Sequence, residues 1–362
     1  MQSLAHGLAA QGMDVTTIIP WEEDKKEVIA ETLEWHRQAE VAVTAAPEFS
    51  RHHQGWHNVK TLAKFVKTFR DVKIVNIHYT QNTSVSLTDI LAIRLAGKKV
   101  VIMVHHPTEW SEIGPKQFQI IKAALRLSKA VVGTTGCMAA LLRQAGVPEQ
   151  KIVTIPLGVI PPKTVCSKTE ARRKLNIPVE AFVVCCLSRL MAEKGIYELL
   201  EAFIQLPCTE TPVYLVIAGD GPDRKDMEEK AGALLGNRIR FLGKVEDISD
   251  VYASGDIFAL PSYWEGFGLV YVEAAFHGLP CIGTNVGGTP FVIEDGVTGL
   301  LVPPRDAAAL TAALKCLRNQ SAVRHRMGNA AQVRAQAEFT EEKMARRFQA
   351  LFQSLGVKDE AA

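Results

Sequence analysis

Short apolar runs rich in β-branched residues recur along the chain, and each has the length of a buried strand. Examples are DVTTII, KVVIMV and FVVCCL. Between many of them lie stretches with apolar residues at helical spacing, such as GIYELLEAFIQL. Strands that are apolar at nearly every position and alternate with helices form parallel sheets covered by helices on both faces. The pattern therefore predicts an α/β protein built from doubly wound sheets.

A break in this pattern predicts a domain boundary. A chain of 362 residues exceeds the usual length of one compact domain. The segment IPLGVIPPKT contains three prolines and a glycine, so we place the boundary near residue 160. Ligands of doubly wound domains bind at the carboxyl ends of the strands. We therefore expect the functional site at such an edge.

Composition narrows the class of protein. Apolar residues make up 47% and charged residues 22%, and the formal net charge is +2. These values argue against a disordered chain and against a basic nucleic-acid-binding protein. No apolar run approaches the roughly 20 residues that cross a bilayer. The seven cysteines have no zinc-site or CxxC spacing, so we expect reduced thiols in a cytoplasmic protein.

The first residues raise a separate question. MQSLAHGLAAQGMDVTTIIP opens in the middle of a helical pattern, whereas a doubly wound domain normally begins with a strand and a turn. We expect residues 2–20 to form the first helix and the second strand, with the first strand and its turn missing. The alternative is a fold that begins with a helix.

Two strand-to-helix turns carry candidate chemistry. Arg189 and Lys194 lie in the turn of CLSRLMAEKGIYELL, where two cations beside a helix N-terminus would favour an anion. Surface charge at a helix start is the alternative. Gly219 and Gly221 lie in the turn of VIAGDGP, and turn glycines alone explain them because this is no GxGxxG motif.

The segment SYWEGFGLVYVEAAFHG places Glu265 before a Gly-Phe-Gly turn and Glu273 about two helical turns beyond it. The glycines permit close approach to a ligand, and the helix-start amides can face an anion. Separated carboxylates on either side suit hydroxyl groups at the two ends of a diphosphate, one on a sugar and one on a ribose. Solvated glutamates are the alternative. A further glycine turn, TNVGGTP, is expected to border the same site.

SRLMAEKG, VIAGDGP, FLGKV and SYWEGFGLVYVEAAFHGLPCIGTNVGGTP resemble, in this order, the motifs of the family 4 retaining glycosyltransferases. The resemblance covers nearly all of the second half of the chain and, more loosely, the first half. It implies the GT-B fold, with two Rossmann-like doubly wound domains facing across a cleft. The implied domains are an acceptor-side domain at 1–160, a nucleotide-sugar-binding domain at 161–335, and a C-terminal helix at 336–362 that packs back on the first domain.

The resemblance also implies roles for individual residues. Arg189 and Lys194 would hold the diphosphate, Glu265 hydroxyls of the transferred sugar, and Glu273 hydroxyls of the ribose. His105, which follows KVVIMV, would face the donor sugar and its phosphate; His106 is a weaker match, and His78 would line the acceptor side. Further substrate-binding residues would be Gly219, Val245, Gly266, Phe267, Gly268, Leu269 and Val270.

The implied reaction moves a hexose-type sugar from a UDP-, GDP- or ADP-sugar to a glycan, lipid-linked or small-molecule acceptor. Retention without a visible nucleophile favours a same-face, oxocarbenium-like substitution. We expect no cofactor and no metal, since no carboxylate pair suits Mg²⁺. The alternatives are a non-catalytic nucleotide-sugar-binding protein, suggested by the missing start, and an epimerase or phosphorylase, the latter of which would need a pyridoxal phosphate lysine.

Some positions depart from the family pattern. Leu157 stands where the family usually has an asparagine, and Phe291 where a glutamate is common.

In residues 58–70 a basic stripe flanks an apolar one, which predicts peripheral contact with an anionic membrane, at the inner face. The alternative is a helix whose apolar side packs on its own sheet. Nucleic acid is not an expected partner.

Overall fold

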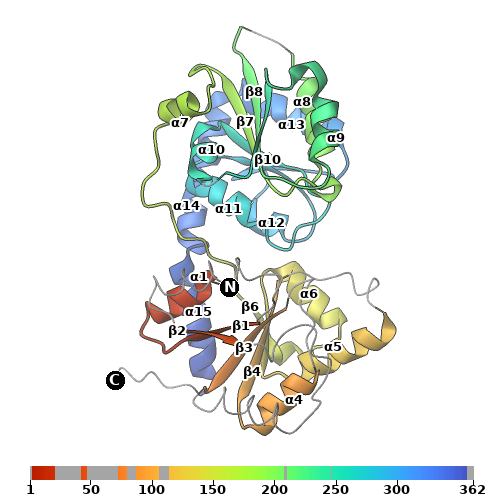
Figure 1. Cartoon of the computed structure of the whole chain (residues 1–362), viewed down its shortest axis with the longest axis vertical. Helices are drawn as coiled ribbons and strands as arrows, with labels where there is room; N and C mark the ends of the chain where they lie inside the picture. Colours follow the sequence, from red (N-terminus) through yellow and green to blue (C-terminus); the bar gives the residue numbers. More distant parts are fainter. Residues whose placement is uncertain are drawn as a thin grey trace. The chain divides into compact units, whose positions relative to one another are not determined.

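The protein is described by a computed structural model in which the chain divides into two compact units. Unit 1 comprises Met1–Gly158 and Glu341–Ala362, and unit 2 comprises Val159–Thr340 (Figure 1). The boundaries expected from the sequence were residues 160 and 335. The structure describes residues 2–20, 42–46, 72–79, 87–105, 114–207, 210–245 and 247–356.

Unit 2 is built on a six-stranded parallel sheet. The strand order is β12-β11-β10-β7-β8-β9, so the chain builds outward from β7 in one direction and then, from β10, in the other. β7 and β10 are therefore neighbours at the point where the order reverses, which is where doubly wound sheets bind ligands. The strands are β7 (Phe182–Leu187), β8 (Val213–Ala218), β9 (Ile239–Gly243), β10 (Ile257–Leu260), β11 (Cys281–Thr284) and β12 (Gly299–Val302).

Helices cover both faces of this sheet, because its central strands are apolar at every position. Val184, Val216 and Phe258 are fully buried. α8 packs against α9 and α13, whereas α10 packs against α7 and α11 against α14. The helices are α7 (Lys168–Lys174), α8 (Ile196–Ile204), α9 (Arg224–Ala231), α10 (Ser249–Ser254), α11 (Leu269–Phe276), α12 (Thr289–Val292), α13 (Ala307–Asn319) and α14 (Ser321–Glu338).

Unit 1 contains a four-stranded parallel sheet in the order β3-β4-β5-β6 and a separate parallel pair, β1-β2. The helix and strand expected within residues 2–20 are confirmed as α1 and β1. The strands are β1 (Thr16–Pro20), β2 (Ala42–Ala46), β3 (Ile74–Tyr79), β4 (Lys99–Val104), β5 (Ala130–Gly133) and β6 (Ile152–Thr154). The helices are α1 (Gln2–Ala9), α4 (Leu87–Leu95), α5 (Pro115–Leu127), α6 (Gly136–Gln144) and α15 (Glu341–Ser354).

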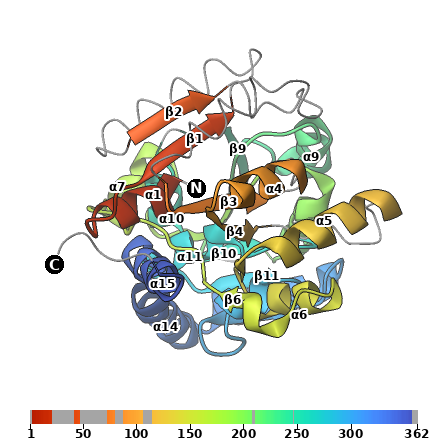
Figure 2. The same cartoon turned by 90° about the horizontal axis from the view of Figure 1, so that it is seen from below.

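Alternate residues of β4 face two separate cores, as the period of a strand requires. Val100 and Ile102 pack with α4, α5 and α6, while Val101 and Met103 pack with α1 and α15 (Figure 2). α15 thus joins unit 1 through its apolar stripe. The C-terminal helix expected at 336–362 begins instead at Glu341, because α14 of unit 2 continues to Glu338.

Two expectations fall outside the described residues: the basic segment 58–70 and His106. Among the helices that the structure does describe, none combines the length and the apolar character needed to span a membrane.

Candidate functional site

The carboxyl ends of β7 and β10 bring Lys194 and Glu265 together. Lys194 Nζ lies 2.8 Å from Glu265 Oε1, and the two side chains are only 22% and 14% exposed. The Ser262 hydroxyl donates a second hydrogen bond, also 2.8 Å long, to the same oxygen. Charge-assisted hydrogen bonds of this kind are shorter and stronger than bonds between neutral groups. Sequence reasoning missed Ser262, although it lies three residues before Glu265 in the same loop.

Close backbone contact fixes this geometry. Gly195, which follows Lys194, has a φ of 68°, and a Cβ at this position would clash with the backbone carbonyl of Pro261. The Tyr263 amide donates to the Glu193 carbonyl at 2.8 Å, joining the same two turns. The two charged side chains therefore meet because the backbones that carry them already touch.

The second glycine turn supports the first. The Gly288 amide donates to the Glu265 carbonyl at 2.8 Å. A Cβ at Gly287 would clash with that carbonyl, and one at Gly288 with the Gly266 carbonyl. TNVGGTP thus lies directly against the loop that carries Glu265, as the sequence analysis expected.

Gly268 leads the chain into α11. Its φ is 85°, which favours glycine, and α11 begins at the next residue. The amides of Leu269 and Val270 are in the first turn, where a helix leaves its N–H groups without helical acceptors. The side chain of Phe267 is buried, so it packs in the core of unit 2 and not on an open surface.

Glu273 has a different environment from Glu265. The Tyr252 hydroxyl donates to Glu273 Oε2 at 2.7 Å from within the core of unit 2. Burial raises the pKa of Glu273, and the hydrogen bond from Tyr252 opposes that rise. Sequence spacing gave no signal for Tyr252, because 21 residues separate it from Glu273.

Further predicted residues follow the neighbouring strands. Arg189 lies just beyond β7 with an exposed side chain, and it forms no ion pair within the part of the chain that the structure describes. Gly219 follows β8, and a Cβ there would clash with the Ser188 carbonyl, so it does more than turn the chain. Val245 lies half-buried just after β9. All three therefore lie at the carboxyl ends of the strands, as Lys194 does.

Phe291, which departs from the family pattern, belongs to an aromatic cluster. Its ring centroid lies 6.1 Å from that of Phe267 and 6.1 Å from that of Phe339. The Phe267 and Phe339 rings meet edge to face, 5.7 Å apart. Phe291 therefore packs against the interior side of the Gly-Phe-Gly turn, where an aromatic ring stabilises the loop.

In unit 1, His105 follows β4 and contacts His78 of β3. His78 Nδ1 and His105 Nε2 are 2.7 Å apart, and Asn76 Nδ2 lies 3.2 Å from His78 Nε2. Burial lowers the pKa of His105 to about 4 and also lowers the pKa of His78. Both imidazoles are therefore neutral near pH 7. The sequence predicts both histidines as site residues but does not predict this contact.

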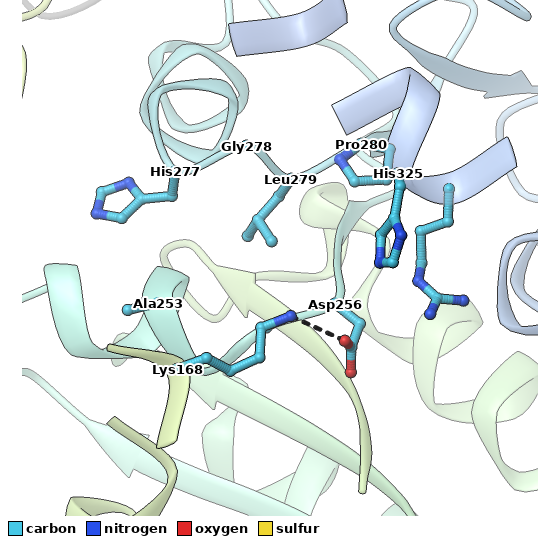
Figure 3. Close-up of a pocket in the computed structure, with 10 residues that line it drawn as sticks. Lys168, Ala253, Asp256, His277, Gly278, Leu279, Pro280 and His325 are labelled. Atoms are coloured by element: carbon cyan, nitrogen blue, oxygen red, sulfur yellow. Dashed lines mark hydrogen bonds and ion pairs between the residues drawn. The ribbon is translucent and has the colours of Figure 1, made fainter. Parts of the chain in front are cut away.

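A small pocket of about 80 Å³ lies at the opposite edge of the sheet in unit 2 (Figure 3). Asp256 and Pro280, which line it, directly precede β10 and β11, so it sits at the amino ends of the strands. Lys168 donates to Asp256 there, at 3.0 Å. This pocket contains none of the predicted site residues.

Arg189 and Lys194 lie at the carboxyl ends of the strands in unit 2, and Lys194 is paired there with Glu265. Among the described residues, no group of three or more histidines, cysteines, aspartates or glutamates is arranged to hold a metal ion.

Two family models match the chain. The model described as Glycosyltransferase Family 4 matches residues 1–161, and the model described as Glycosyl transferases group 1 matches residues 167–334. N-acetyl-alpha-D-glucosaminyl L-malate synthase of Bacillus anthracis is 25% identical over 289 residues, which cover 78% of this chain and 74% of that protein. D-inositol 3-phosphate glycosyltransferase of Corynebacterium kroppenstedtii is 36% identical over 168 residues, but these cover only 44% of this chain and 37% of that protein.

Solved structures resemble the whole chain. HepE of Anabaena in complex with UDP has a TM-score of 0.84 and 21% identity, over 98% of this chain and 96% of that chain. Sucrose-phosphate synthase of Thermosynechococcus elongatus has a TM-score of 0.73 and 24% identity, over 97% of this chain and 91% of that chain. These likenesses confirm the predicted fold class: two parallel-sheet α/β domains of the GT-B type.

Proposed function

Because this chain belongs to the family 4 glycosyltransferases, we propose that it moves a hexose-type sugar from a nucleotide diphosphate sugar, with retention of configuration. The acceptor class is a glycan, a lipid-linked sugar or a small molecule. The observation that carries the proposal is the Lys194–Glu265 pair at the switch point, with Arg189 exposed just after the end of β7. A cation and a carboxylate held together at one edge suit a ligand that carries both phosphate and hydroxyl groups.

Arg189 and Lys194 would bind the diphosphate, and the first-turn amides of α11 would add donors to it. As the glycosidic bond breaks, negative charge develops on the leaving phosphate. Fixed cations and amides stabilise this charge without reorganising, which is worth several kcal/mol in a site closed to water. Glu265 would accept from hydroxyls of the sugar, and Glu273 from hydroxyls of the ribose.

In the proposed step, the bond from the sugar's anomeric carbon to the phosphate oxygen breaks. A bond to the acceptor oxygen forms on the same face, and the acceptor's proton passes to the leaving phosphate. His105 would face the donor sugar. UDP-glucose is the first donor to test, because HepE, a structural relative, was solved in complex with it.

The direct test is binding and turnover with UDP and UDP-glucose. Each of Arg189→Ala and Glu273→Ala removes a charge-assisted hydrogen bond, so calorimetry should show donor affinity reduced roughly ten- to a hundredfold. Lys225→Ala, at an 86% exposed position on α9, is the matched control and should bind as the parent does.

Three outcomes are informative. Equal affinity in the parent and both variants would reject the site assignment. Tight donor binding with no sugar transfer to any acceptor would favour the non-catalytic binding protein. Binding of GDP or ADP but not of UDP would identify a different donor nucleotide and would leave the site assignment unchanged.

A further inference from the structure

Three polar side chains share one face at the carboxyl end of the sheet in unit 1. Asn76 and His78 are two residues apart on β3, so they point to the same side of the strand. His78 pairs in register with Met103 of β4, and His105 lies two residues after Met103. Parallel register therefore places Asn76, His78 and His105 in one row on this face of the sheet.

The row is connected by hydrogen bonds. The two imidazole planes are inclined by only 19°, with centroids 5.0 Å apart, while the facing nitrogens are 2.7 Å apart. Nitrogens so much closer than the centroids lie between the rings, which describes an edge-to-edge hydrogen bond and not a face-to-face stack. Asn76 Nδ2 meets the other nitrogen of His78 at 3.2 Å.

The direction of these bonds follows from counting protons. A neutral imidazole carries one N–H, so one ring nitrogen donates and the other accepts. With Nδ2 of Asn76 facing Nε2 of His78, that nitrogen accepts and the proton of His78 is on Nδ1. His78 Nδ1 then donates to His105 Nε2, which leaves the proton of His105 on its own Nδ1.

We propose that Asn76 and His78 are positioning residues that hold His105 in its Nδ1-protonated form, so that Nδ1–H is the donor His105 presents to the ligand. Nδ1 of His105 makes no hydrogen bond within the part of the chain that the structure describes. The inference rests on the proposed function for the identity of that ligand, a sugar or phosphate oxygen of the donor. The hydrogen-bond chain itself is independent of it.

A merely space-filling role fits these residues poorly. The three side chains are half-buried. Polar groups withdrawn from water without a hydrogen-bond partner cost more free energy than apolar residues of the same size, so hydrogen bonds within the row favour its presence here. Asn76 Oδ1 has no hydrogen-bond partner among the described residues. Leaving this oxygen unpaired is the free-energy cost of directing Nδ2 toward His78. Orientation of His105 is what this arrangement provides and a leucine would not.

The test is the tautomer of His105, read from ring-nitrogen chemical shifts of the full-length protein labelled with ¹⁵N-histidine, without any substrate. His105→Gln assigns the signals. The parent should show an Nδ1-protonated, neutral His105. His78→Phe and Asn76→Leu should each move it toward the Nε2-protonated form or a mixture, and His325→Phe, a histidine of α14, should leave it unchanged.

An Nε2-protonated His105 in the parent would overturn the proposal, because it would mean that the amide faces the other way and every donor in the chain is reversed. The proposal also fails if His105 keeps its tautomer in both variants. If one of the two variants fails to fold, the other still tests the proposal, because each variant removes a different hydrogen bond of the row.

Turnover gives a second readout. Loss of one hydrogen bond should lower kcat/KM about three- to tenfold in His78→Phe. The amide of His78→Gln can still donate to His105, so this variant should recover part of the lost kcat/KM together with the Nδ1-protonated form of His105. A purely structural role of His78 predicts no such parallel recovery. If the parent transfers no sugar, the proposed function fails, but the nitrogen shifts still decide this inference.

Discussion

At the scale of single residues, the site depends on partners that adjust each charged group. Glu265 is ion-paired with Lys194 and hydrogen-bonded by Ser262, whereas Glu273 is half-buried and hydrogen-bonded by Tyr252. Two carboxylates in one motif therefore have different local electrostatics, which agrees with contacts to different parts of a ligand. The motif places both glutamates, and their partners come from elsewhere in the fold.

Tyr252→Phe tests this at Glu273. Burial raises the pKa of Glu273 and the tyrosine hydroxyl opposes the rise, so its removal should raise this pKa further. Nucleotide binding that needs the carboxylate is lost as the pH falls through the pKa, so the loss should occur at a higher pH in the variant. At neutral pH, the affinity for UDP should fall about three- to tenfold.

Calorimetric titration of UDP across the acidic pH range measures both effects. Tyr214→Phe is the control, because that hydroxyl is not part of the site and its ring, which contacts Arg240, is retained. Identical pH profiles for the parent and Tyr252→Phe would show that the hydroxyl does not tune Glu273.

At the scale of secondary-structure elements, contacts between turns show why glycine is needed at particular positions of the motifs. The glycines at 195, 219 and 287 each lie where a Cβ would meet a neighbouring backbone carbonyl. The sequence identified the turns but gave no reason to prefer close approach over simple turning, because the carbonyls belong to distant segments. The packing of α15 against α1 is a similar case, since the helices are at opposite ends of the chain.

Glu341 makes the α1–α15 contact sensitive to pH. It is half-buried at the start of α15, its Oε1 has no partner among the described residues, and burial raises its pKa to about 7. A carboxyl group with a raised folded-state pKa stabilises the fold fully below its unfolded-state pKa, and this stability is lost as the pH rises through about 7.

Glu341→Gln should therefore be more stable than the parent above pH 7 and similar to it near pH 4. Allowing for solvent screening of a half-exposed group, we expect a gain of about 1–2 kcal/mol in the free energy of unfolding at pH 8. Urea denaturation at a series of pH values measures it. Glu342→Gln, next along the helix, exposed and paired with Arg346, should show no such pH dependence; parallel curves for Glu341→Gln and the parent would refute the assignment.

At the scale of the whole molecule, membrane contact stays a prediction from the basic stripe in residues 58–70. Each cation near an anionic surface contributes about 1 kcal/mol, and salt screens it. The protein should co-sediment with anionic vesicles at low salt and be released at high salt. A variant with Lys64→Glu and Lys67→Glu should stay in solution, whereas the control with Lys225→Glu and Lys315→Glu in unit 2 should bind.

A parent protein that remains in the supernatant with anionic vesicles at low salt would remove the membrane proposal. A soluble acceptor would then be the better candidate. Binding that is equal in both charge-reversed variants would place the contact elsewhere on the chain.

The sequence by itself determined the alternation of strands and helices, the boundary near residue 160, and the residues of the Glu265–Glu273 motif. These follow from local patterns: apolar periodicity, proline and glycine placement, and a motif contiguous in the chain. It also located His105 after an apolar strand, with the help of the family resemblance.

Only the tertiary structure decided which groups hold those residues. The hydroxyl of Tyr252, the loop of Gly287 and Gly288, and the row that joins Asn76 and His78 to His105 come from segments whose spacing in the chain has no fixed period. Strand order and register bring them together, and both are set by packing across the whole sheet. Local patterns cannot encode contacts that arise only when distant strands become neighbours.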